Sequence, residues 1–232
     1  MKLDNITLLS VCGHTDYLDG TIKALYQCMK DIEFKSVKLL SNEERNLKDI
    51  EVIKIPPLDR EKYAFFCIYD LPQYVDTDFC LMVQHDGFII NPQLWDEKFL
   101  QFDYIGAPWL YAPNTTIIFH KHNYVGNGGF CIRSQKFLHS AKTLKYNSKI
   151  KFQWHIPAGQ LVTPEDWFIC SHSYRKMLDM NVKFADIKTA YRFSVEHPSN
   201  MVNYDVNDIS TYKSFGFHGN FNTAAMKLLE EQ

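Results

Sequence analysis

Short apolar runs alternate with amphipathic segments over the first half of the chain. Residues 6–11 form a mostly apolar run before Gly13, which predicts a buried strand. Residues 16–30 carry apolar side chains at helical spacing and predict a helix. The same patterns predict strands at residues 37–40, 52–55 and 79–84 and a helix at residues 60–69. Strands that alternate with helices are typical of an α/β fold with a mostly parallel sheet.

The second half of the chain has a weaker periodicity. Helices are predicted at residues 92–101, 134–146, 164–180 and 224–231, and strands at residues 182–186 and 215–218. Thr163 is the expected N-cap of the third of these helices, with Pro164 in its first turn. Residues 114–123 have no clear period and predict a loop or a mobile strand. Because no repeat, low-complexity tract or linker interrupts the chain, we predict one domain over residues 1–232.

The composition mainly excludes classes of protein and of binding partner. Hydrophobic residues make up 46% and charged residues 22% of the 232 positions, which is typical of a globular protein. The net charge of −2 gives no reason to expect nucleic-acid binding. Lysines 142, 145, 149 and 151 leave a contact with an anionic acceptor or a peripheral contact with lipid headgroups open, although a solvated surface is the more common role of such a run.

The termini and cysteines bear on localisation. The six cysteines form no CxxC pair, which favours buried, reduced thiols. The N-terminus has no signal-peptide pattern, and no apolar window of about 18 residues predicts a transmembrane helix. We therefore expect a cytoplasmic protein.

Candidate chemistry begins where strands are predicted to end. In a parallel sheet, ligands bind outside the carboxyl ends of the strands, which points to residues 11–14 and 84–87 together. Asp86 would present a carboxylate there, as a divalent cation bridging a diphosphate requires. A strand followed by an Asp-Gly turn explains the same segment without any function.

Three further segments carry candidate groups. Residues 126–133 (GNGGFCIR) suggest a backbone that approaches a ligand closely, or only a glycine-rich turn. Glu165 and Asp166 open a predicted helix, and either could act as a general base or simply interact with the helix dipole. His218 follows a late strand and could bind a metal or a phosphate. No zinc-binding spacing occurs.

The order of these segments resembles a known family. Residues 84–92 (QHDGFIINP), 104–109 (YIGAPW), 126–133, 165–168 (EDWF) and 215–219 (FGFHG) are similar to a glycosyltransferase family long labelled a domain of unknown function. That family occurs in bacterial polysaccharide loci and some large viruses. The resemblance runs from about residue 6 to residue 220. It implies a GT-A-like fold, with residues 1–110 as the nucleotide-sugar-binding half and 111–232 as the acceptor and catalytic half.

The resemblance also implies roles for individual residues. Asp86 corresponds to the metal-binding acid of the DxD motif, and His218 to the late histidine that completes a site for Mn²⁺ or Mg²⁺. Asp166 or Glu165 would supply the base of an inverting transfer. Successive helix residues point about 100° apart, so only one of the two can face the sugar, and Asp166 is preferred. The other residues implied are Val11, Gly13, Tyr17, Gln84, His85, Asn127, Gly128 and Gly129 for the donor and Trp109 and Trp167 for the acceptor.

Two features qualify these expectations. Gln84, a neutral residue, stands at the first DxD position, which weakens the case for tight metal binding and leaves His85 as a substitute ligand. The helix N-terminus is expected to lower the pKa of Asp166.

The expected function is the transfer of a sugar from a nucleotide-sugar donor, with a UDP-sugar as first candidate, to a glycan or lipid-linked glycan acceptor. The alternatives are a nucleotidyltransferase, which would normally have a basic glycine-rich loop early in the chain, and a non-catalytic nucleotide-sugar or glycan-binding protein. The residues leave donor, acceptor, linkage and oligomeric state open.

Overall fold

The computed structural model describes residues 1–109, 124–149, 162–199 and 201–230. Within these ranges, a central sheet has the strand order β3-β2-β1-β4-β6-β5, and β7 pairs with β8 in a second, small sheet. The strands are β1 Lys2–Cys12, β2 Glu33–Ser41, β3 Glu51–Lys54, β4 Phe79–Met82, β5 Tyr104–Gly106, β6 Cys131–Ser134, β7 Ser194–Val195 and β8 Gly216–Phe217.

Short helices outnumber long ones. The α-helices are α1 Leu18–Met29, α2 Arg60–Tyr69, α3 Gln135–Lys142, α4 Glu165–Trp167, α5 Tyr174–Asp179, α6 Ile187–Phe193 and α7 Thr223–Met226. A π-helical turn, η5, covers Phe168–His172. The 3₁₀ helices are η1 Thr15–Tyr17, η2 Leu71–Tyr74, η3 Pro92–Leu94, η4 Glu97–Gln101, η6 Ile209–Thr211 and η7 Lys227–Leu229.

The central sheet is mostly parallel. Strands β3, β2, β1 and β4 run in the same direction, whereas β6 is antiparallel to both β4 and β5. Strand β1 lies between β2 and β4, and Ile6, Leu8 and Leu9 on it are fully buried. A strand covered on both faces needs apolar side chains on both, which explains the apolar run in the sequence. The predicted α/β fold is confirmed.

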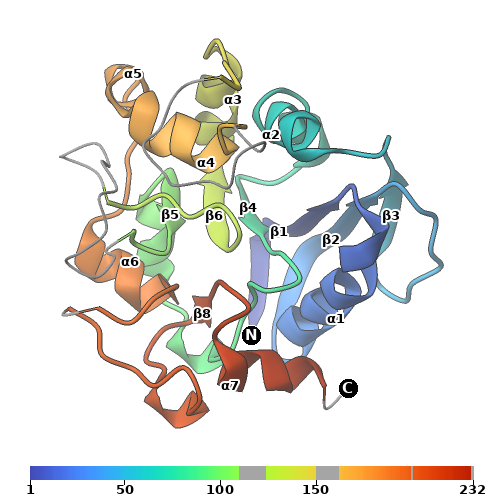
Figure 1. Ribbon diagram of the computed structural model, residues 1–232, viewed down its shortest axis with the longest axis vertical. Coiled ribbons are helices and arrows are strands. Elements are labelled where there is room, and N and C mark those ends of the chain that lie inside the picture. Colours follow the sequence, from blue (N-terminus) through green and yellow to red (C-terminus); the bar gives the residue numbers. More distant parts are fainter. Residues whose placement is uncertain (110–123, 150–161, 200, 231–232) are drawn as a thin grey trace.

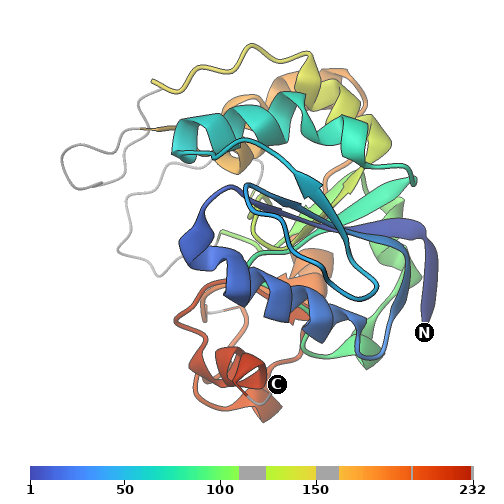
Figure 2. The same cartoon turned by 90° about the vertical axis from the view of Figure 1, so that its right-hand side faces the viewer.

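Helices cover both faces of the sheet (Figures 1 and 2). Figure 2 shows α1 on one face and α2 with α3 on the other. The Asp59 carboxylate caps α2 by accepting a hydrogen bond from Lys62 N at 2.9 Å. The Ser134 hydroxyl caps α3 by accepting one from Phe137 N at 3.0 Å. Both caps satisfy a backbone N–H group that has no partner within the helix.

The second half departs from the predicted elements. The helix predicted at residues 92–101 is two 3₁₀ helices, because Asp96 accepts a hydrogen bond from Lys98 N and starts η4. The helix predicted at residues 164–180 begins at Glu165 and is interrupted by η5 before α5. Thr163 does not cap it, since the Thr163 hydroxyl donates to Ser148 O at 3.1 Å. These predictions were wrong in detail.

The segment after α5 also differs. Residues 182–186 form no strand of the sheet and meet β5 through a single bridge between Tyr104 and Phe184. Asp186 instead caps α6, which the sequence patterns did not predict, by accepting from Thr189 N at 3.0 Å. The predicted terminal helix is short, with α7 followed by η7. The loop or strand predicted at residues 114–123 lies outside the described residues.

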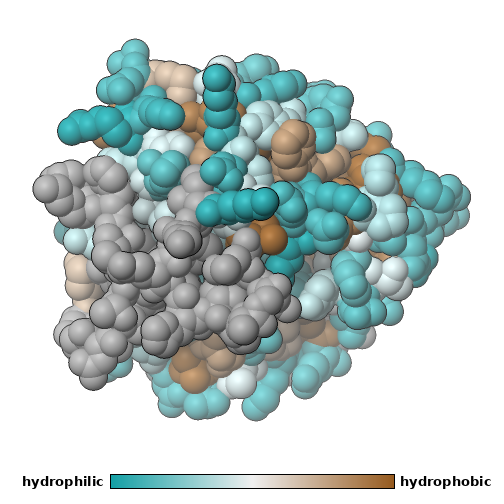
Figure 3. Space-filling view, turned by 45° about the horizontal axis from the view of Figure 1, so that its top comes forward, coloured by the Kyte–Doolittle hydropathy of each residue, from teal (hydrophilic) through white to brown (hydrophobic). Residues whose placement is uncertain are grey.

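Figure 3 shows a face that is mainly hydrophilic where described residues form it, with small, separate apolar patches. None of the helices described is long and apolar enough to cross a bilayer.

Candidate functional site

The segment after β4 makes a tight turn at the carboxyl end of the sheet. Gln84 N donates to Gly87 O and Gly87 N to Gln84 O, both at 3.1 Å. The turn presents His85 beside the segment that follows β1, where the Tyr17 ring stacks on the His85 ring with centroids 4.5 Å apart. Tyr17 is 51% exposed, so an aromatic ring at this edge is open to a ligand. The carboxyl ends of β1 and β4 therefore meet, as the sequence predicted.

Two other residues proposed for the donor lie deeper at this edge. The Val11 side chain is buried in the core, so only its backbone could face a ligand. Gly13 packs against Leu58, whose N–H donates to Gly13 O at 3.0 Å. These contacts anchor the loop that carries Tyr17.

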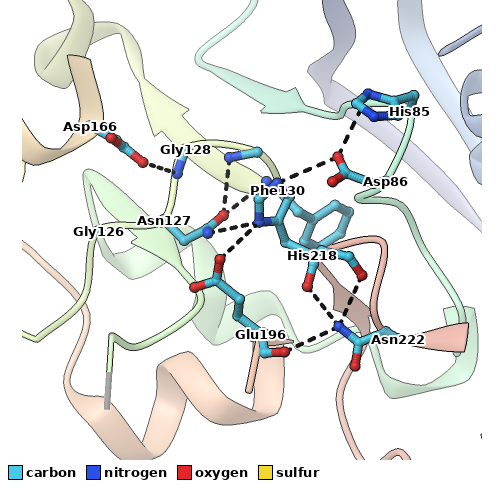
Figure 4. Close-up of polar contacts among 12 residues, drawn as sticks. His85, Asp86, Gly126, Asn127, Gly128, Phe130, Asp166, Glu196, His218 and Asn222 are labelled. Atoms are coloured by element: carbon cyan, nitrogen blue, oxygen red, sulfur yellow. Dashed lines mark hydrogen bonds and ion pairs between the residues drawn. The ribbon is translucent and has the colours of Figure 1, made fainter. Parts of the chain in front are cut away.

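Asp86 and His218 lie side by side although 132 residues separate them in the numbering (Figure 4). The Asp86 Oδ1 atom is 3.5 Å from His218 Nε2. Gly219 N donates to Asp86 O at 2.7 Å, which ties the two segments together through the backbone. Gly219 has a φ of +101°, a conformation that favours glycine.

The other ring nitrogen of His218 contacts a buried carboxylate. Glu196 Oε1 lies 3.2 Å from His218 Nδ1, and Asn127 Nδ2 lies 2.9 Å from the same atom. Burial by itself lowers the pKa of His218, but the hydrogen bond and charge of Glu196 and the charge of Asp86 outweigh it and leave the pKa raised. Burial raises the pKa of Glu196, and the His218 hydrogen bond reverses this and leaves that pKa lowered. Both shifts favour an ion pair.

The glycine-rich segment, residues 126–133, passes very close to His218 and to the turn that carries Asp86. A Cβ atom placed on Gly129 would lie 2.0 Å from His218 Nε2, and one on Gly87 would lie 2.9 Å from Gly129 O. Asn127 holds the segment in this path, because Asn127 Oδ1 accepts hydrogen bonds from Gly129 N at 3.0 Å and Phe130 N at 3.4 Å. Glycine at residues 87 and 129 therefore permits three segments to converge.

Asp166 lies on the other side of the same segment. Its Oδ2 atom accepts a hydrogen bond from Gly128 N at 2.9 Å, and its Oδ1 atom accepts one from Trp167 N at 2.6 Å. Burial, together with the charge of Glu165, raises the pKa of Asp166 to about 7. The expectation that the helix N-terminus lowers this pKa was wrong, because desolvation of the carboxylate outweighs the two backbone hydrogen bonds.

Glu165 points into the protein interior. Its Oε1 atom is 3.2 Å from Arg133 Nη2, and both side chains are almost fully buried. The guanidinium compensates the Glu165 charge, which would otherwise be costly at this depth. Both acids border the glycine-rich segment, since a Cβ on Gly128 would lie 2.9 Å from Glu165 Oε1 and 3.2 Å from Asp166 Oδ2. Glu165 also joins α4 to β6.

Gln84, which occupies the first DxD position, is held by a tyrosine. Gln84 Nε2 donates to the Tyr63 hydroxyl at 2.8 Å. Its Oε1 atom faces the glycine-rich segment, since a Cβ on Gly129 would lie 2.9 Å from it. Gln84 thus offers one neutral acceptor atom next to His218.

The two tryptophans predicted to contact an acceptor belong to the core. Trp109 is 5% and Trp167 is 9% exposed. The Trp109 ring covers Gly126, where an added Cβ would lie 2.3 Å from Cη2 of the indole. Packing is thus the role that the structure describes for both rings, and acceptor contact stays a prediction.

The sequence analysis did not identify two residues that hold His218 in position, Glu196 and Asn222. Glu196 directly follows β7, so an acid after a short strand, the signal that pointed to Asp86, could have found it. Asn222 is fully buried and gave no signal. Its Nδ2 atom donates to His218 O at 2.8 Å and Glu196 O at 3.1 Å, and its Oδ1 accepts from the Tyr204 hydroxyl at 2.9 Å. Asn222 therefore joins the two segments that bring Glu196 and His218 together (Figure 4).

The donor set around Asp86 fits a divalent cation. Asp86 Oδ1 is buried and accepts no hydrogen bond from the described residues, so this oxygen is available as a ligand. His218 Nε2 adds a nitrogen ligand next to it, and His85 Nδ1 lies 3.7 Å from Asp86 Oδ1. Within the described ranges there is no group of three or more acidic, histidine or cysteine side chains that could hold a metal by itself. Such a partial set suits Mg²⁺ or Mn²⁺ bound jointly with phosphate oxygens.

Residues 66–218 match a family described as a protein of unknown function, DUF5672. The chain belongs to this family. No curated protein sequence matches it. The matched range contains Asp86, the glycine-rich segment, Asp166 and His218, whereas Tyr17 precedes it and Asn222 follows it.

Solved structures identify the fold of this DUF5672 chain as that of GT-A glycosyltransferases. An active-site mutant of LgtC is 16% identical, with a TM-score of 0.51 over 100% of this chain and 94% of that chain. A glycosyltransferase involved in the glycosylation of the major capsid of PBCV-1 is 14% identical, with a TM-score of 0.51 over 98% and 99%. The galactosyltransferase LgtC with donor and acceptor sugar analogues is 14% identical, with a TM-score of 0.49 over 100% and 94%. The two structures with a TM-score of 0.51 confirm the fold expected from the sequence motifs.

Proposed function

We propose that this protein is a glycosyltransferase that moves a sugar from a nucleotide-diphosphate donor to a hydroxyl group of a glycan or lipid-linked glycan. The observation that carries the proposal is the convergence of Asp86 and His218 on one side of the glycine-rich segment with Asp166 on its other side. A GT-A fold supports the class of reaction, and uridine diphosphate is the first candidate for the departing group.

On the donor side, Asp86 and His218 would hold Mn²⁺ or Mg²⁺ together with the diphosphate. The cation would supply positive charge to the departing phosphate oxygens. Tyr17 and His85 would contact the nucleoside, because the exposed Tyr17 ring lies at the same edge of the sheet. Gln84 Oε1 would accept a hydrogen bond from a donor hydroxyl group.

On the acceptor side, Asp166 would be the general base. The acceptor oxygen would attack the anomeric carbon, its proton would pass to a carboxylate oxygen of Asp166, and the nucleoside diphosphate would leave. A single displacement of this kind inverts the anomeric configuration. The two backbone hydrogen bonds fix the Asp166 carboxylate, and a pKa of about 7 suits a base that works near neutral pH.

The deciding experiment measures binding of uridine diphosphate by calorimetry, with and without Mn²⁺, in the wild type, Asp86→Asn and the exposed control Asp4→Asn. We expect Mn²⁺ to strengthen nucleotide binding in the wild type and the control, and Asp86→Asn to abolish the gain. Equal affinity with and without Mn²⁺ in all three proteins would refute the cation site. Incubation with a panel of UDP-sugars then separates glycosyl transfer from nucleotidyl transfer and from binding alone, since only the first releases uridine diphosphate.

A further inference from the structure

His218 Nδ1 lies within hydrogen-bonding distance of two groups. One requires it to accept a hydrogen bond and the other requires it to donate one. Asn127 Nδ2 is 2.9 Å away and can only donate a hydrogen bond, whereas the Glu196 carboxylate oxygen is 3.2 Å away and can only accept one when ionised. One ring nitrogen cannot satisfy both partners at once. The proton on this nitrogen therefore decides which contact is a hydrogen bond.

The orientation of the Asn127 amide is not free to resolve this conflict. Its Oδ1 atom accepts hydrogen bonds from Gly129 N and Phe130 N, so its Nδ2 atom must be the one that faces His218. The same Asn127 amide also hydrogen-bonds the Glu196 carboxylate. Asn127 can therefore donate either to the histidine ring or to Glu196, without turning its side chain over.

Cation binding at Nε2 requires a neutral His218 ring, for which these contacts allow two forms. With the proton on Nε2, Nδ1 accepts from Asn127, and the N–H group of Nε2 points toward Asp86 Oδ1, 3.5 Å away. With the proton on Nδ1, His218 donates to Glu196, Asn127 donates to Glu196 as well, and the lone pair of Nε2 faces Asp86. Only the second form leaves a nitrogen ligand next to the carboxylate, because a protonated nitrogen cannot bind a cation.

We propose that Glu196 and Asn127 are positioning residues that set the tautomer of His218, and that cation binding selects the form with the proton on Nδ1. The inference rests on the cation site of the proposed function and adds that a defined tautomer of His218 accompanies cation binding. On binding, the ring gives up the Nε2 proton to water, and the proton it carries is the one on Nδ1, which is donated to Glu196. A carboxylate that accepts from a metal-binding histidine also fixes the ring orientation.

The first test reads the tautomer directly. Nitrogen-15 NMR of protein labelled at histidine distinguishes protonated from unprotonated ring nitrogens, and His218→Asn identifies the His218 signals. With Mg²⁺ and uridine diphosphate added, we expect the wild type to carry its His218 proton on Nδ1 alone. A proton on Nε2 in the loaded protein would overturn the proposal.

The second test measures Mn²⁺ binding in the presence of uridine diphosphate. We expect the affinity to fall roughly 10–100-fold in Glu196→Ala, the usual range for loss of such a partner, and less in Glu196→Gln, which keeps an acceptor oxygen. The exposed control Glu33→Ala should bind as the wild type does. Because Tyr204 and Asn222 are bound to the backbone oxygen of Glu196, side-chain removal leaves these anchors in place. Unchanged nucleotide affinity without metal serves as the folding control.

The two hypotheses fail in different ways. If Mn²⁺ binding is lost in Asp86→Asn but unchanged in Glu196→Ala, the tautomer proposal is wrong and the cation site stands. If the wild type with uridine diphosphate binds no Mn²⁺ at all, the cation site is wrong and the tautomer proposal falls with it.

Discussion

Asp86 and Asp166 lie on opposite sides of the glycine-rich segment and have opposite surroundings (Figure 4). Asp86 has a buried oxygen that accepts no hydrogen bond from the described residues, and two imidazole rings are its neighbours. Asp166 accepts a backbone hydrogen bond on each oxygen, and its neighbour Glu165 is negatively charged. The same type of side chain thus has an oxygen without a hydrogen bond in one region and is held by a hydrogen bond on each oxygen in the other.

The difference indicates a division of tasks. An unsatisfied carboxylate oxygen beside a histidine suits a cation, which would replace the missing hydrogen-bond donors. A carboxylate that is held in place and has a raised pKa suits proton transfer, because its proton affinity is matched to neutral pH. The variants below test whether the two regions are separable.

The largest effect is expected for Asp166→Asn. Removal of a general base should lower turnover by about 10²–10⁴-fold, while Mn²⁺-dependent binding of uridine diphosphate is retained. Steady-state kinetics and calorimetry on the same preparation measure the two properties. Loss of nucleotide binding in this variant, or a product with the donor's anomeric configuration, would contradict the division.

Glu165→Ala should act mainly on stability. It leaves Arg133 buried without its carboxylate partner, so we expect the free energy of unfolding to fall by about 3–5 kcal/mol in urea titrations. Replacing both partners, Glu165→Leu with Arg133→Met, should cost less than the single variant. A single variant as stable as the wild type would mean that the pair does not join α4 to β6.

Alanine substitutions at Gly128 and Gly129 should affect the Asp166 region and the Asp86 region differently. A Cβ on Gly129 would meet His218 Nε2 at 2.0 Å, whereas one on Gly128 would meet Glu165 Oε1 at 2.9 Å and Asp166 Oδ2 at 3.2 Å. We expect Gly129→Ala to weaken Mn²⁺ binding by at least the roughly 10–100-fold that is typical when a metal ligand loses the partner that positions it. Gly128→Ala should change turnover more than Mn²⁺ affinity. Equal effects of both variants on Mn²⁺ affinity would show that the two sides are coupled.

The smallest effect near neutrality is a pH dependence. Because the pKa of Asp166 is about 7, kcat/KM should fall about tenfold per pH unit below that value as the base is protonated. The residual kcat/KM of Asp166→Asn should not show this fall at low pH. A wild-type profile that is flat down to pH 5 would remove Asp166 as the base.

The same group should affect stability with a defined sign. A raised pKa means that the folded state binds the proton more tightly, so this contribution is complete below the unfolded-state value near 3.8 and is lost as the pH rises through about 7. The free energy of unfolding of the wild type, relative to Asp166→Asn, should therefore decline between these pH values. Urea titrations at several pH values measure the difference.

Local patterns predicted the regular half of the fold well. Strand β1 and helices α1 and α2 follow from apolar periodicity, since burial of one helix face or both strand faces leaves a direct mark on the sequence. In the second half, β5, α6 and β7 escaped prediction. These elements are short, and tertiary contacts such as the cap of α6 by Asp186 define them rather than periodicity.

The sequence by itself determined the α/β class and the identity of the candidate groups Asp86, Asp166 and His218, because each stands at the expected end of an element. Only the tertiary structure decided their states. The raised pKa of Asp166, the open oxygen of Asp86 and the contacts of His218 with Glu196 and Asn127 arise where segments distant in sequence exclude water from one another. Desolvation and hydrogen bonding depend on that three-dimensional neighbourhood, which no local pattern of residues records.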